Sequence, residues 1–417
     1  MKEASESARR RIMPLDFTFS EEQQLFRKNV KEFLKREIEP GVDHINRTEE
    51  WPEEELKKIA SQGYMGVPFP KKYGGMGYGE VEYDILMEEL GKIDISFTTT
   101  VGAHCGLACQ SVYMFGNEEQ REKYLKPLAR GEKLGAFGLT EPEAGSDAAA
   151  LKTSAVKKGN HYVLNGSKQF ISNGDMADVV IVFATSDPSL GHRGISAFIV
   201  EKGTPGFSPG KLEDKMGIRA SHTAELFFED CEIPEENLLG QEGRGYPVAL
   251  TILDGGRASL SAGPLGSAER AFELVVDHVR KSVPPEKLME REGLIFELSD
   301  LATQIKAARY FCYHVGASIG EYIEMVANHQ EITKELRETI SRNAAMAKTF
   351  ITEVSSHVID GCIQIIGEES YRELSYLGKS FNDSFIGEIY EGTNDINRLV
   401  VGMDIVKRGI EDEWRLR

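Results

Sequence analysis

Apolar residues recur at helical spacing along the first third of the chain, which predicts an all-helical N-terminal region. Ser20 and Gln23 are spaced as in a capping box, just ahead of the first amphipathic run. That run contains Leu25, Phe26, Val30, Phe33 and Leu34. Residues 81–90 repeat the helical period, residues 95–115 are apolar enough for a buried helix, and residues 118–128 close the region.

The pattern changes near Ala136, where short runs of β-branched and aromatic residues alternate with turn residues. The runs lie at residues 162–164, 179–183, 195–200 and 224–228, and turn pairs such as Asn165-Gly166 and Asn173-Gly174 separate them. This pattern is typical of strands joined by tight turns. We therefore predict a small antiparallel β domain in the middle of the chain.

Long helical patterns occupy the remainder, over residues 247–279, 290–328 and 333–366. Helices of this length with few capping signals are typical of a bundle. The predicted fold class is α+β and multi-domain. It comprises an N-terminal extension (residues 1–14), an N-terminal α-helical domain (15–136), a middle antiparallel β domain (137–243) and a C-terminal four-helix-bundle domain (244–417).

Composition and charge exclude several classes of function. The chain has 417 residues and a formal net charge of −18, whereas nucleic-acid binders need a basic surface. No apolar stretch is long enough to span a membrane, and residues 1–14 lack the apolar core of a signal peptide. Five cysteines, an odd number, favour a reducing compartment. His104, Cys105 and Cys109 lack a fourth metal ligand, so we expect no metal site. The cysteines and the lack of a signal peptide together lead us to expect a cytoplasmic protein.

One carboxylate is a candidate catalytic group. Glu391 lies between the apolar, strand-like run of residues 386–390 and Gly392, and Asn394 then opens a helical pattern. A carboxylate on a partly apolar turn loses hydration, so we expect a raised pKa, which suits proton abstraction near neutral pH. The alternative is a carboxylate that complements the dipole at a helix N-terminus. The residues alone are compatible with both interpretations.

Two other stretches are candidate cofactor sites. In the loop of residues 136–147, Thr140, Gly145 and Ser146 offer hydroxyl and backbone N–H donors to phosphate oxygens, although a polar interdomain linker has the same composition. The loop has neither the G-x-G-x-x-G nor the P-loop pattern. Phe170 and Ser172 share one face of a predicted strand, where the ring could flank a flat heterocycle. Alternatively, Phe170 fills the core of the β domain.

Five motifs, in this order along the chain, resemble those of the acyl-CoA dehydrogenase family. They are Leu139-Thr140-Glu141-Pro142 with Gly145-Ser146-Asp147, Asn165-Gly166-Ser167-Lys168, Asp214-Lys215-Met216-Gly217, Leu253-Asp254-Gly255-Gly256-Arg257 and Ile389-Tyr390-Glu391-Gly392-Thr393. Each motif is modest alone, but their order and the α-β-α texture are highly specific. The resemblance extends from about Asp16 to Val406.

The resemblance implies an FAD-dependent enzyme that desaturates an acyl-CoA thioester between Cα and Cβ and passes electrons to an electron-transfer flavoprotein. Glu391 would take the α-proton while the β-hydrogen leaves as hydride to flavin N5. That α-proton is too weakly acidic for a carboxylate in water, so the developing enolate must be stabilised at the thioester oxygen. In the family, the backbone N–H of the catalytic glutamate and a flavin ribityl hydroxyl do this. Some relatives carry the base just before Arg257, but here that position is Gly256.

The same resemblance implies a set of binding residues. The cofactor contacts are Phe137, Leu139, Thr140, Gly145, Ser146, Phe170, Ile171, Ser172, Arg280, Ser282, Gln364, Gly367, Gly392, Thr393 and Asp395. The acyl-CoA contacts are Ser146, Asp254, Arg257, Tyr390, Glu391 and Gly392. Phe170 replaces a tryptophan that many relatives have, and both residues offer a flat stacking face.

The chain departs from the family on the side that a neighbouring subunit of a homotetramer lends to the adenosine half of FAD. A Lys-Ser pair follows Arg280 instead of Phe-Gly, and Glu292 replaces a glutamine. Gly367-Glu368 replaces Gly-Gly, and Asn382-Asp383 replaces Arg-Asp. A divergent subfamily that rebuilds the adenine site explains these changes. A heteromer in which a sister chain completes the site, for a bulky acyl-CoA, explains them as well.

Three functional hypotheses other than the dehydrogenase are also compatible with the sequence. An acyl-CoA oxidase or a flavin monooxygenase shares the fold but reacts with oxygen, and a non-catalytic partner subunit needs no base. Glu391 in a complete Tyr-Glu-Gly-Thr setting speaks against the partner subunit. The small residues Gly102, Ala103, Gly106 and Ala108 suggest room for a bulky acyl group.

Overall fold

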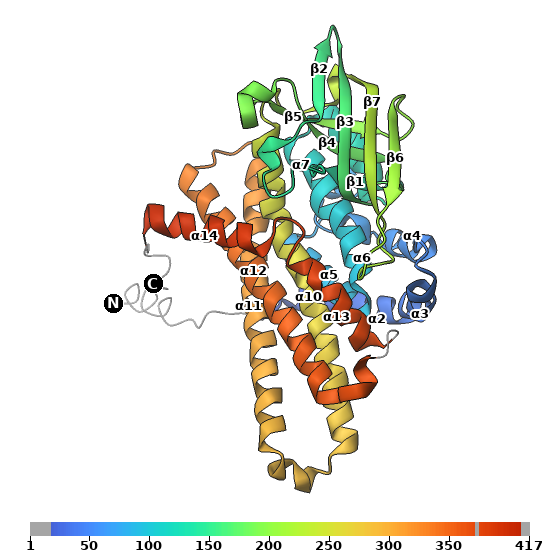
Figure 1. Ribbon diagram of the computed structural model, residues 1–417, viewed down its shortest axis with the longest axis vertical. Coiled ribbons are helices and arrows are strands. Elements are labelled where there is room, and N and C mark those ends of the chain that lie inside the picture. Colours follow the sequence, from blue (N-terminus) through green and yellow to red (C-terminus); the bar gives the residue numbers. More distant parts are fainter. Residues whose placement is uncertain (1–17, 372–374, 410–417) are drawn as a thin grey trace, which may run out of the picture.

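The computed structural model describes residues 18–371 and 375–409, and these residues follow the predicted order of helices, strands and helices. A β sheet lies at one end of the long axis, the N-terminal helices pack beneath and beside it, and long C-terminal helices extend to the other end (Figure 1). The predicted N-terminal extension, residues 1–14, lies outside the described residues.

The N-terminal helices begin at the predicted capping box. The Ser20 hydroxyl accepts from the Gln23 N–H and the Gln23 side chain accepts from the Ser20 N–H, which confirms that prediction. The predicted buried helix over residues 95–115 is also confirmed, and its middle third winds as a π-helix, η3. The helices of this region are α2 (Glu21–Glu37), α3 (Glu39–Thr48), α4 (Glu53–Ser61), η1 (Tyr64–Gly66), η2 (Lys71–Tyr73), α5 (Glu80–Ile93), α6 (Ile95–Val101), η3 (Gly102–Cys109), α7 (Gln110–Phe115), α8 (Glu118–Gln120), η4 (Arg121–Leu125) and α9 (Lys126–Ala129).

The middle sheet is built mostly from antiparallel pairs, in the order β6-β7-β3-β2-β4-β5-β8. Its strands are β1 (Gly135–Gly138), β2 (Ser154–Lys158), β3 (His161–Ser172), β4 (Val179–Thr185), β5 (Ile195–Glu201), β6 (Phe207–Leu212), β7 (Thr223–Pro234) and β8 (Leu238–Leu239). β1 runs parallel to β4, and β2 meets β4 in parallel at one pair, Ser154 with Thr185. β1 departs from the antiparallel pattern because it enters from the helical domain, so no hairpin turn sets its direction.

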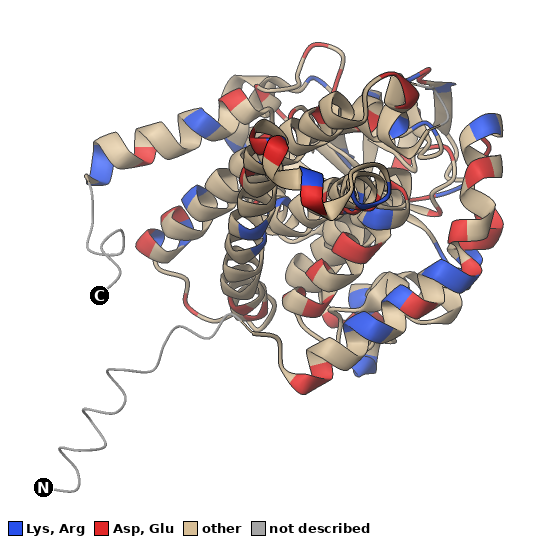
Figure 2. Ribbon diagram, turned by 90° about the horizontal axis from the view of Figure 1, so that it is seen from below, with Lys and Arg blue, Asp and Glu red and all other residues tan. Residues whose placement is uncertain are grey.

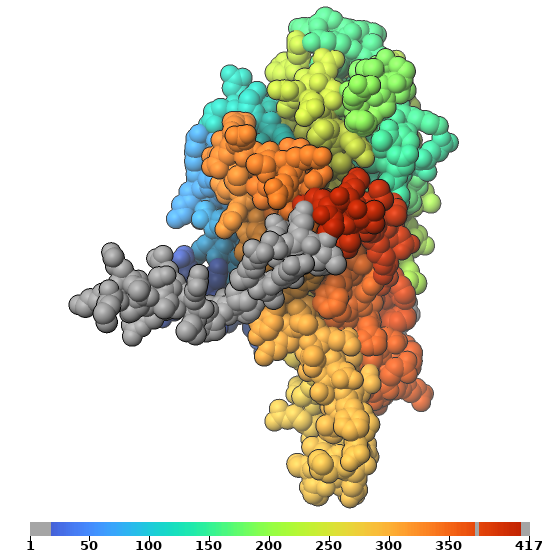
Figure 3. All heavy atoms as spheres, turned by 90° about the vertical axis from the view of Figure 1, so that its left-hand side faces the viewer, coloured from blue at the N-terminus to red at the C-terminus, as the bar shows by residue number. Residues whose placement is uncertain are grey.

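The C-terminal helices are α10 (Gly245–Ser282), α11 (Glu292–Ala327), α12 (Lys334–Ile366), α13 (Tyr376–Gly387) and α14 (Asn394–Arg408). The three long helices confirm the predicted patterns to within a few residues. The end of α10 and the start of α11 project from the body as a narrow stalk (Figure 3). The strand-like reading of residues 386–390 is wrong. The Ser375 hydroxyl caps α13 by accepting from the Gly378 N–H, and this helix continues to Gly387 before the chain turns.

Two buried side chains join the helical region to the sheet. His104 accepts from the Gly135 N–H at Nδ1 (2.9 Å), and its Nε2 lies 3.1 Å from the Leu128 carbonyl. Burial lowers the pKa of His104 to about 4, so its ring is neutral. Asn173 donates to the carbonyls of Thr100 (3.0 Å) and Gly135 (3.2 Å). These bonds fix the end of β3 and the start of β1 against α6 and η3.

All five cysteines are reduced and buried. Within the described residues, no helix combines the length and apolar composition needed to cross a bilayer. Basic and acidic residues are interspersed along the helices seen from below (Figure 2).

Candidate active site

Glu391 lies on a tight turn between α13 and α14. The Asn394 N–H donates to the Glu388 carbonyl at 2.9 Å, and the Thr393 hydroxyl caps α14 by accepting from the Ile396 N–H. Glu391 has φ +51° and Gly392 has φ +90°, so both lie in the left-handed region that a glutamate rarely adopts. Within the described part of the chain, the Glu391 N–H donates no hydrogen bond. This N–H is available to a ligand.

The Glu391 carboxylate lies against the bare backbone of Gly256 on α10. A Cβ placed on Gly256 would lie 2.8 Å from Oε2 and 3.2 Å from Oε1 of Glu391, and 3.2 Å from Cδ2 of Leu107. Oε2 is buried and has no hydrogen-bond partner among the described residues. Buried carboxylate oxygens are normally paired, so an unpaired one is a candidate for contact with a substrate.

Burial raises the pKa of Glu391 to about 7, and the nearby positive charges of Arg257 and Lys348 partly oppose that rise. The predicted rise is therefore confirmed, and its main cause is the predicted loss of hydration. A carboxylate with this pKa is substantially ionised at neutral pH and binds a proton readily. These are the properties of a general base.

Arg257 and Asp254, which the resemblance gives as acyl-CoA contacts, both lie at the turn that carries Glu391. Arg257 donates from Nε to the Glu391 carbonyl at 3.3 Å and from Nη1 to Asp254 at 2.5 Å. Asp254 also accepts from the Ser341 hydroxyl at 3.1 Å. Burial raises the pKa of Asp254 and the Arg257 guanidinium opposes this. Both side chains are buried, so they support the turn from beneath.

Sequence reasoning missed Lys348. This fully buried lysine on α12 donates from Nζ to the Gly392 carbonyl at 3.0 Å and to Asn394 Oδ1 at 2.8 Å. A signal was available, because Lys348 interrupts a face of α12 that otherwise buries small and apolar residues, such as Ala344, Ala345 and Ile351. A lysine on such a face is seldom buried without a specific partner.

Phe170 lies on an irregular part of β3. It has φ +59°, and the pairing of β3 with β7 shifts register between Lys168 and Ile171. The bulge turns the Phe170 ring outward, where 58% of the residue is exposed, while Ile171 packs in the core of the β domain. The alternative reading, in which Phe170 fills that core, is therefore wrong. For Ile171, only the backbone can face a ligand.

The loop after β1 is held by a buried ion pair. Lys168 is fully buried and donates to the Leu139 carbonyl (3.1 Å) and to Glu141 Oε1 (2.7 Å). Glu141 in turn accepts from the N–H groups of Lys152 (2.6 Å) and Thr153 (3.0 Å). Of the other predicted contacts here, Phe137 and Leu139 are buried, Thr140 is half-buried, and Gly145 and Ser146 are exposed.

The end of β3 and the catalytic turn meet across α6. Asn173, next to Ser172, bonds the Thr100 carbonyl, and the Tyr390 side chain lies against Thr99. Burial raises the pKa of Tyr390 above its ordinary value, with the Glu391 charge adding to the effect. Two predicted patches far apart in the sequence therefore both contact α6.

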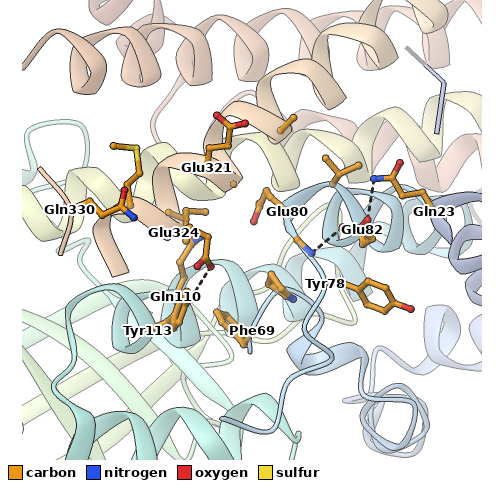
Figure 4. A pocket seen from close by; sticks show the side chains of 17 residues that line it. Gln23, Phe69, Tyr78, Glu80, Glu82, Gln110, Tyr113, Glu321, Glu324 and Gln330 are labelled. Carbon is orange, nitrogen blue, oxygen red and sulfur yellow. Dashed lines mark hydrogen bonds between the residues drawn. The ribbon is translucent and has the colours of Figure 1, made fainter. Parts of the chain in front are cut away.

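A cavity of about 540 Å³ lies apart from the Glu391 turn, between α5, α7 and α11 (Figure 4). Glu80, Gln110, Tyr113 and Glu324 are among its lining residues, and none of the predicted site residues lines it. Gln110 separates it from the catalytic turn, because Gln110 Oε1 packs against Gly255, the neighbour of Gly256. This cavity is therefore distinct from the candidate active site.

Known protein families match nearly the whole chain. The acyl-CoA dehydrogenase N-terminal domain matches residues 20–132, the middle domain matches residues 136–231 and the C-terminal domain matches residues 243–406. The chain belongs to the acyl-CoA dehydrogenase family. It is 41% identical to the short-chain-specific acyl-CoA dehydrogenase of Clostridium acetobutylicum over 94% of this chain and 100% of that protein.

Solved structures agree with this assignment. A chain from work on the electron-transferring flavoprotein of Acidaminococcus fermentans and flavin-based electron bifurcation is 41% identical, with a TM-score of 0.87 over 94% of this chain and 100% of that one. An acyl-CoA dehydrogenase of Bacillus anthracis in complex with FAD is 35% identical, with a TM-score of 0.84 over 95% of this chain and 68% of that one. The protein is an oxidoreductase, and FAD is its cofactor.

The residues of this acyl-CoA dehydrogenase fit a flavin. An aromatic ring as exposed as that of Phe170, on a strained bulge, offers a bare face for a flat heterocycle. At Gly145 a Cβ would meet nothing within 4 Å, so the loop is open for phosphate oxygens to approach its backbone. Phe170 and the loop at Gly145 are therefore compatible with the isoalloxazine and phosphate parts of FAD.

The predicted adenosine contacts lie elsewhere in the chain. Arg280 and Ser282 are exposed at the end of α10, at the stalk, and Gln364 and Gly367 lie where α12 ends. The stalk is at the opposite end of the long axis from the sheet (Figure 1). One chain therefore does not bring these residues to its own β1 and β3.

Asp383 has a different role from the one predicted. It is buried, accepts from the Ile218 N–H at 2.6 Å and pairs with Lys379. A Cβ on Gly217 would lie 2.4 Å from the Asn382 carbonyl oxygen, so the loop after β6 packs directly on α13. The placement of Asp383 on the subunit-facing side is wrong, because its carboxylate joins two domains of the same chain.

Thr393 and Asp395 also differ in their surroundings. The Thr393 hydroxyl is engaged as the cap of α14, whereas the Asp395 side chain is exposed and pairs with Arg398.

Proposed function

We propose that this enzyme desaturates a short acyl-CoA thioester between Cα and Cβ, with Glu391 as the base. The observation that carries the proposal is the Glu391 carboxylate itself. Its Oε2 is buried without a hydrogen-bond partner among the described residues and lies against Gly256, its pKa is about 7, and the N–H of Glu391 is unpaired.

Under this proposal, Glu391 has two roles in the reaction. Its carboxylate accepts the α-proton, and its N–H donates to the thioester oxygen as negative charge develops there. A preorganised donor of this kind contributes about 3–4 kcal/mol to transition-state stabilisation. FAD, when bound, supplies the acceptor for the hydrogen that leaves Cβ. Exclusion of water from the turn strengthens both interactions.

A short acyl group is supported by the packing of η3. The small residues there are already covered by neighbouring side chains. A Cβ on Gly106 would lie 3.4 Å from the Tyr83 hydroxyl, one on Gly102 would lie 3.4 Å from Met87, and Ala108 packs on Gly135. These contacts give the small residues a packing role that does not require a bulky substrate. The short-chain specificity named for the Clostridium relative points the same way.

Partners and assembly are part of the proposal. An electron-transfer flavoprotein is the acceptor that the Acidaminococcus structure supports. A homotetramer supplies the adenosine contacts, because Arg280, Ser282, Gln364 and Gly367 lie away from β1 and β3 of their own subunit. A cytoplasmic location is consistent with five reduced, buried cysteines.

The test is anaerobic reduction of the purified enzyme. Near one FAD per chain, bleached by butyryl-CoA, is the expected result, and Glu391→Gln should retain flavin but lose bleaching by several orders of magnitude. Flavin that no saturated acyl-CoA reduces would refute the proposal. Flavin recovered only after co-expression with a sister chain would instead identify a heteromer, and peroxide on aerobic turnover would identify an oxidase.

A further inference from the structure

Lys348 reaches the catalytic turn from beneath. Its ammonium group contacts the Gly392 carbonyl and Asn394 Oδ1, at 3.0 Å and 2.8 Å, and the residue is wholly removed from solvent. Burying an ammonium group is costly unless its hydrogen bonds are satisfied. A neutral side chain could donate the same bonds without that cost, so the charge itself needs an explanation.

Two cations hold consecutive carbonyls of the turn. Arg257, from α10, donates to the Glu391 carbonyl, and Lys348, from α12, donates to the next one, that of Gly392. Both residues of the turn have positive φ, which is unfavourable for Glu391. A strained backbone of this kind persists only when its surroundings hold it, and these two bonds tie both carbonyls toward the cations.

The neighbours of Lys348 form a closed network. Asn394 donates from Nδ2 to Thr352 Oγ1 (3.1 Å) and Glu353 Oε1 (3.1 Å), and Asn397 donates to the Gly392 carbonyl at 2.9 Å. The bonds of this network link the Gly392 carbonyl to α12 and to the first turn of α14. The position of the catalytic turn is therefore set by α12 as well as by α10.

We propose that Lys348 is a positioning residue for the base: it fixes the Gly392 carbonyl so that the Glu391 carboxylate lies against Gly256, and its charge favours ionised Glu391. This inference rests on the proposed function of Glu391 as the base. It concerns a residue of the chain that does not itself touch the reacting carbon atoms.

The charges around Glu391 support this role. Arg257 faces it from α10, Lys348 from α12 and Tyr83 from α5, with Tyr390 adjacent on the turn. Both cations lower the pKa of Glu391 against the larger effect of burial. Burial lowers the pKa of Lys348 itself to about 8, and Glu391, Glu388 and Glu353 oppose this. Loss of Lys348 leaves Arg257 as the only cation near Glu391 among the described residues.

The experiment compares three variants in the flavin-loaded enzyme. Lys348→Met should lower kcat for the acyl-CoA by about 10–100-fold at pH 7, because the base is displaced and less ionised. It should also move the rising limb of the pH profile of kcat/KM upward by about one pH unit. Lys348→Arg, which keeps the charge, should return the rising limb to the pH at which it lies in the wild type. Thr352→Val loosens the network without changing charge, so it should lower Tm and leave the pH of the rising limb unchanged.

A second readout does not depend on turnover. In a double-mutant cycle of Lys348→Met with Glu391→Gln, the loss of Tm caused by Lys348→Met should be smaller when Glu391 is already neutral. This coupling should be present at pH 7.5, where Glu391 is mostly ionised and Lys348 is still mostly charged, and should disappear at pH 5.5. Additive Tm changes at pH 7.5, or a pH limb that moves equally in Thr352→Val, would show that Lys348 is merely structural. A wild-type enzyme whose flavin no acyl-CoA reduces would refute the proposed function, and the Tm cycle would still test the Lys348–Glu391 coupling.

Discussion

The Glu391 carboxylate occupies the space that a side chain at Gly256 would fill, with its Oε2 2.8 Å from the position of a Cβ on that glycine. The two residues are distant in sequence, one on α10 and one on the turn before α14. Their contact explains why the helix carries a glycine at this point.

Gly256→Ala should reduce catalysis. The new methyl group would press on both carboxylate oxygens and on Leu107, so the base would have to move by a few tenths of an ångström or more. We expect kcat to fall by about tenfold to a hundredfold, since a small misplacement of a catalytic group strongly lowers the rate of the chemical step. Stopped-flow flavin reduction measures this. Gly293→Ala, where a Cβ meets nothing within 4 Å, is the control and should leave the rate unchanged.

The base should be transferable from the turn to the helix. In Gly256→Glu combined with Glu391→Gly, a carboxylate on α10 would enter the space vacated by Glu391. We expect this double variant to recover part of the activity that Glu391→Gly alone loses, because the new group reaches the same side of the substrate. Steady-state kinetics of the three variants test this. No recovery in a folded, flavin-loaded double variant would argue that the orientation of the carboxylate from the turn is essential.

The activity of the wild-type enzyme should rise with pH through neutrality. Glu391 acts only when ionised, and its pKa is about 7, so kcat/KM should increase between about pH 6 and pH 8 and then level off. A pH profile measured at constant ionic strength checks this. A profile that is flat from pH 5 to pH 8 would mean that the ionisation of another group controls the reaction.

Asp84→Asn should stabilise the fold at alkaline pH. Asp84 is fully buried with both oxygens unpaired, and burial together with Glu80 and Glu88 raises its pKa well above the ordinary range of an aspartate. The folded state therefore holds a proton that the unfolded state releases above about pH 4, so stability falls as pH rises by up to ~1.4 kcal/mol per pH unit. Asparagine needs no such proton.

The measurement for Asp84→Asn is Tm or denaturant unfolding at pH 5 and pH 8. The advantage of the variant over the wild type should be larger at pH 8. Glu22→Gln removes a carboxylate from an exposed site on α2 and serves as the control, with no expected pH-dependent gain. An equal effect of Asp84→Asn at both pH values would contradict the raised pKa.

Lys168→Met should destabilise the loop after β1. It would leave Glu141 as a buried carboxylate without its cation, which typically costs about 3–5 kcal/mol. Because Glu141 also holds the Lys152 and Thr153 N–H groups, the loop should shift and the FAD content should fall. Lys168→Met with Glu141→Gln should recover part of the stability. Lys152→Met, which breaks only the exposed pair with Glu143, is the control and should have little effect on Tm or flavin content.

Features of the fold that depend on neighbouring residues were predictable from the sequence. The capping box at Ser20, the long helices and most strands follow from side-chain period and turn residues, which act over a few positions. The strand-like reading of residues 386–390 failed because an apolar run that short has no decisive period, while the Ser375 cap upstream had already begun a helix.

The sequence by itself determined the family, the cofactor and the candidate base, because these are carried by short motifs whose order is preserved. Only the tertiary structure decided the surroundings of the candidate base. Its raised pKa, its contact with Gly256 and its two supporting cations, Arg257 and Lys348, arise where α10 and α12 enclose the turn before α14. Hydration and electrostatic coupling depend on which groups share a buried space, and the proximity of residues distant in sequence is set by packing rather than by local pattern.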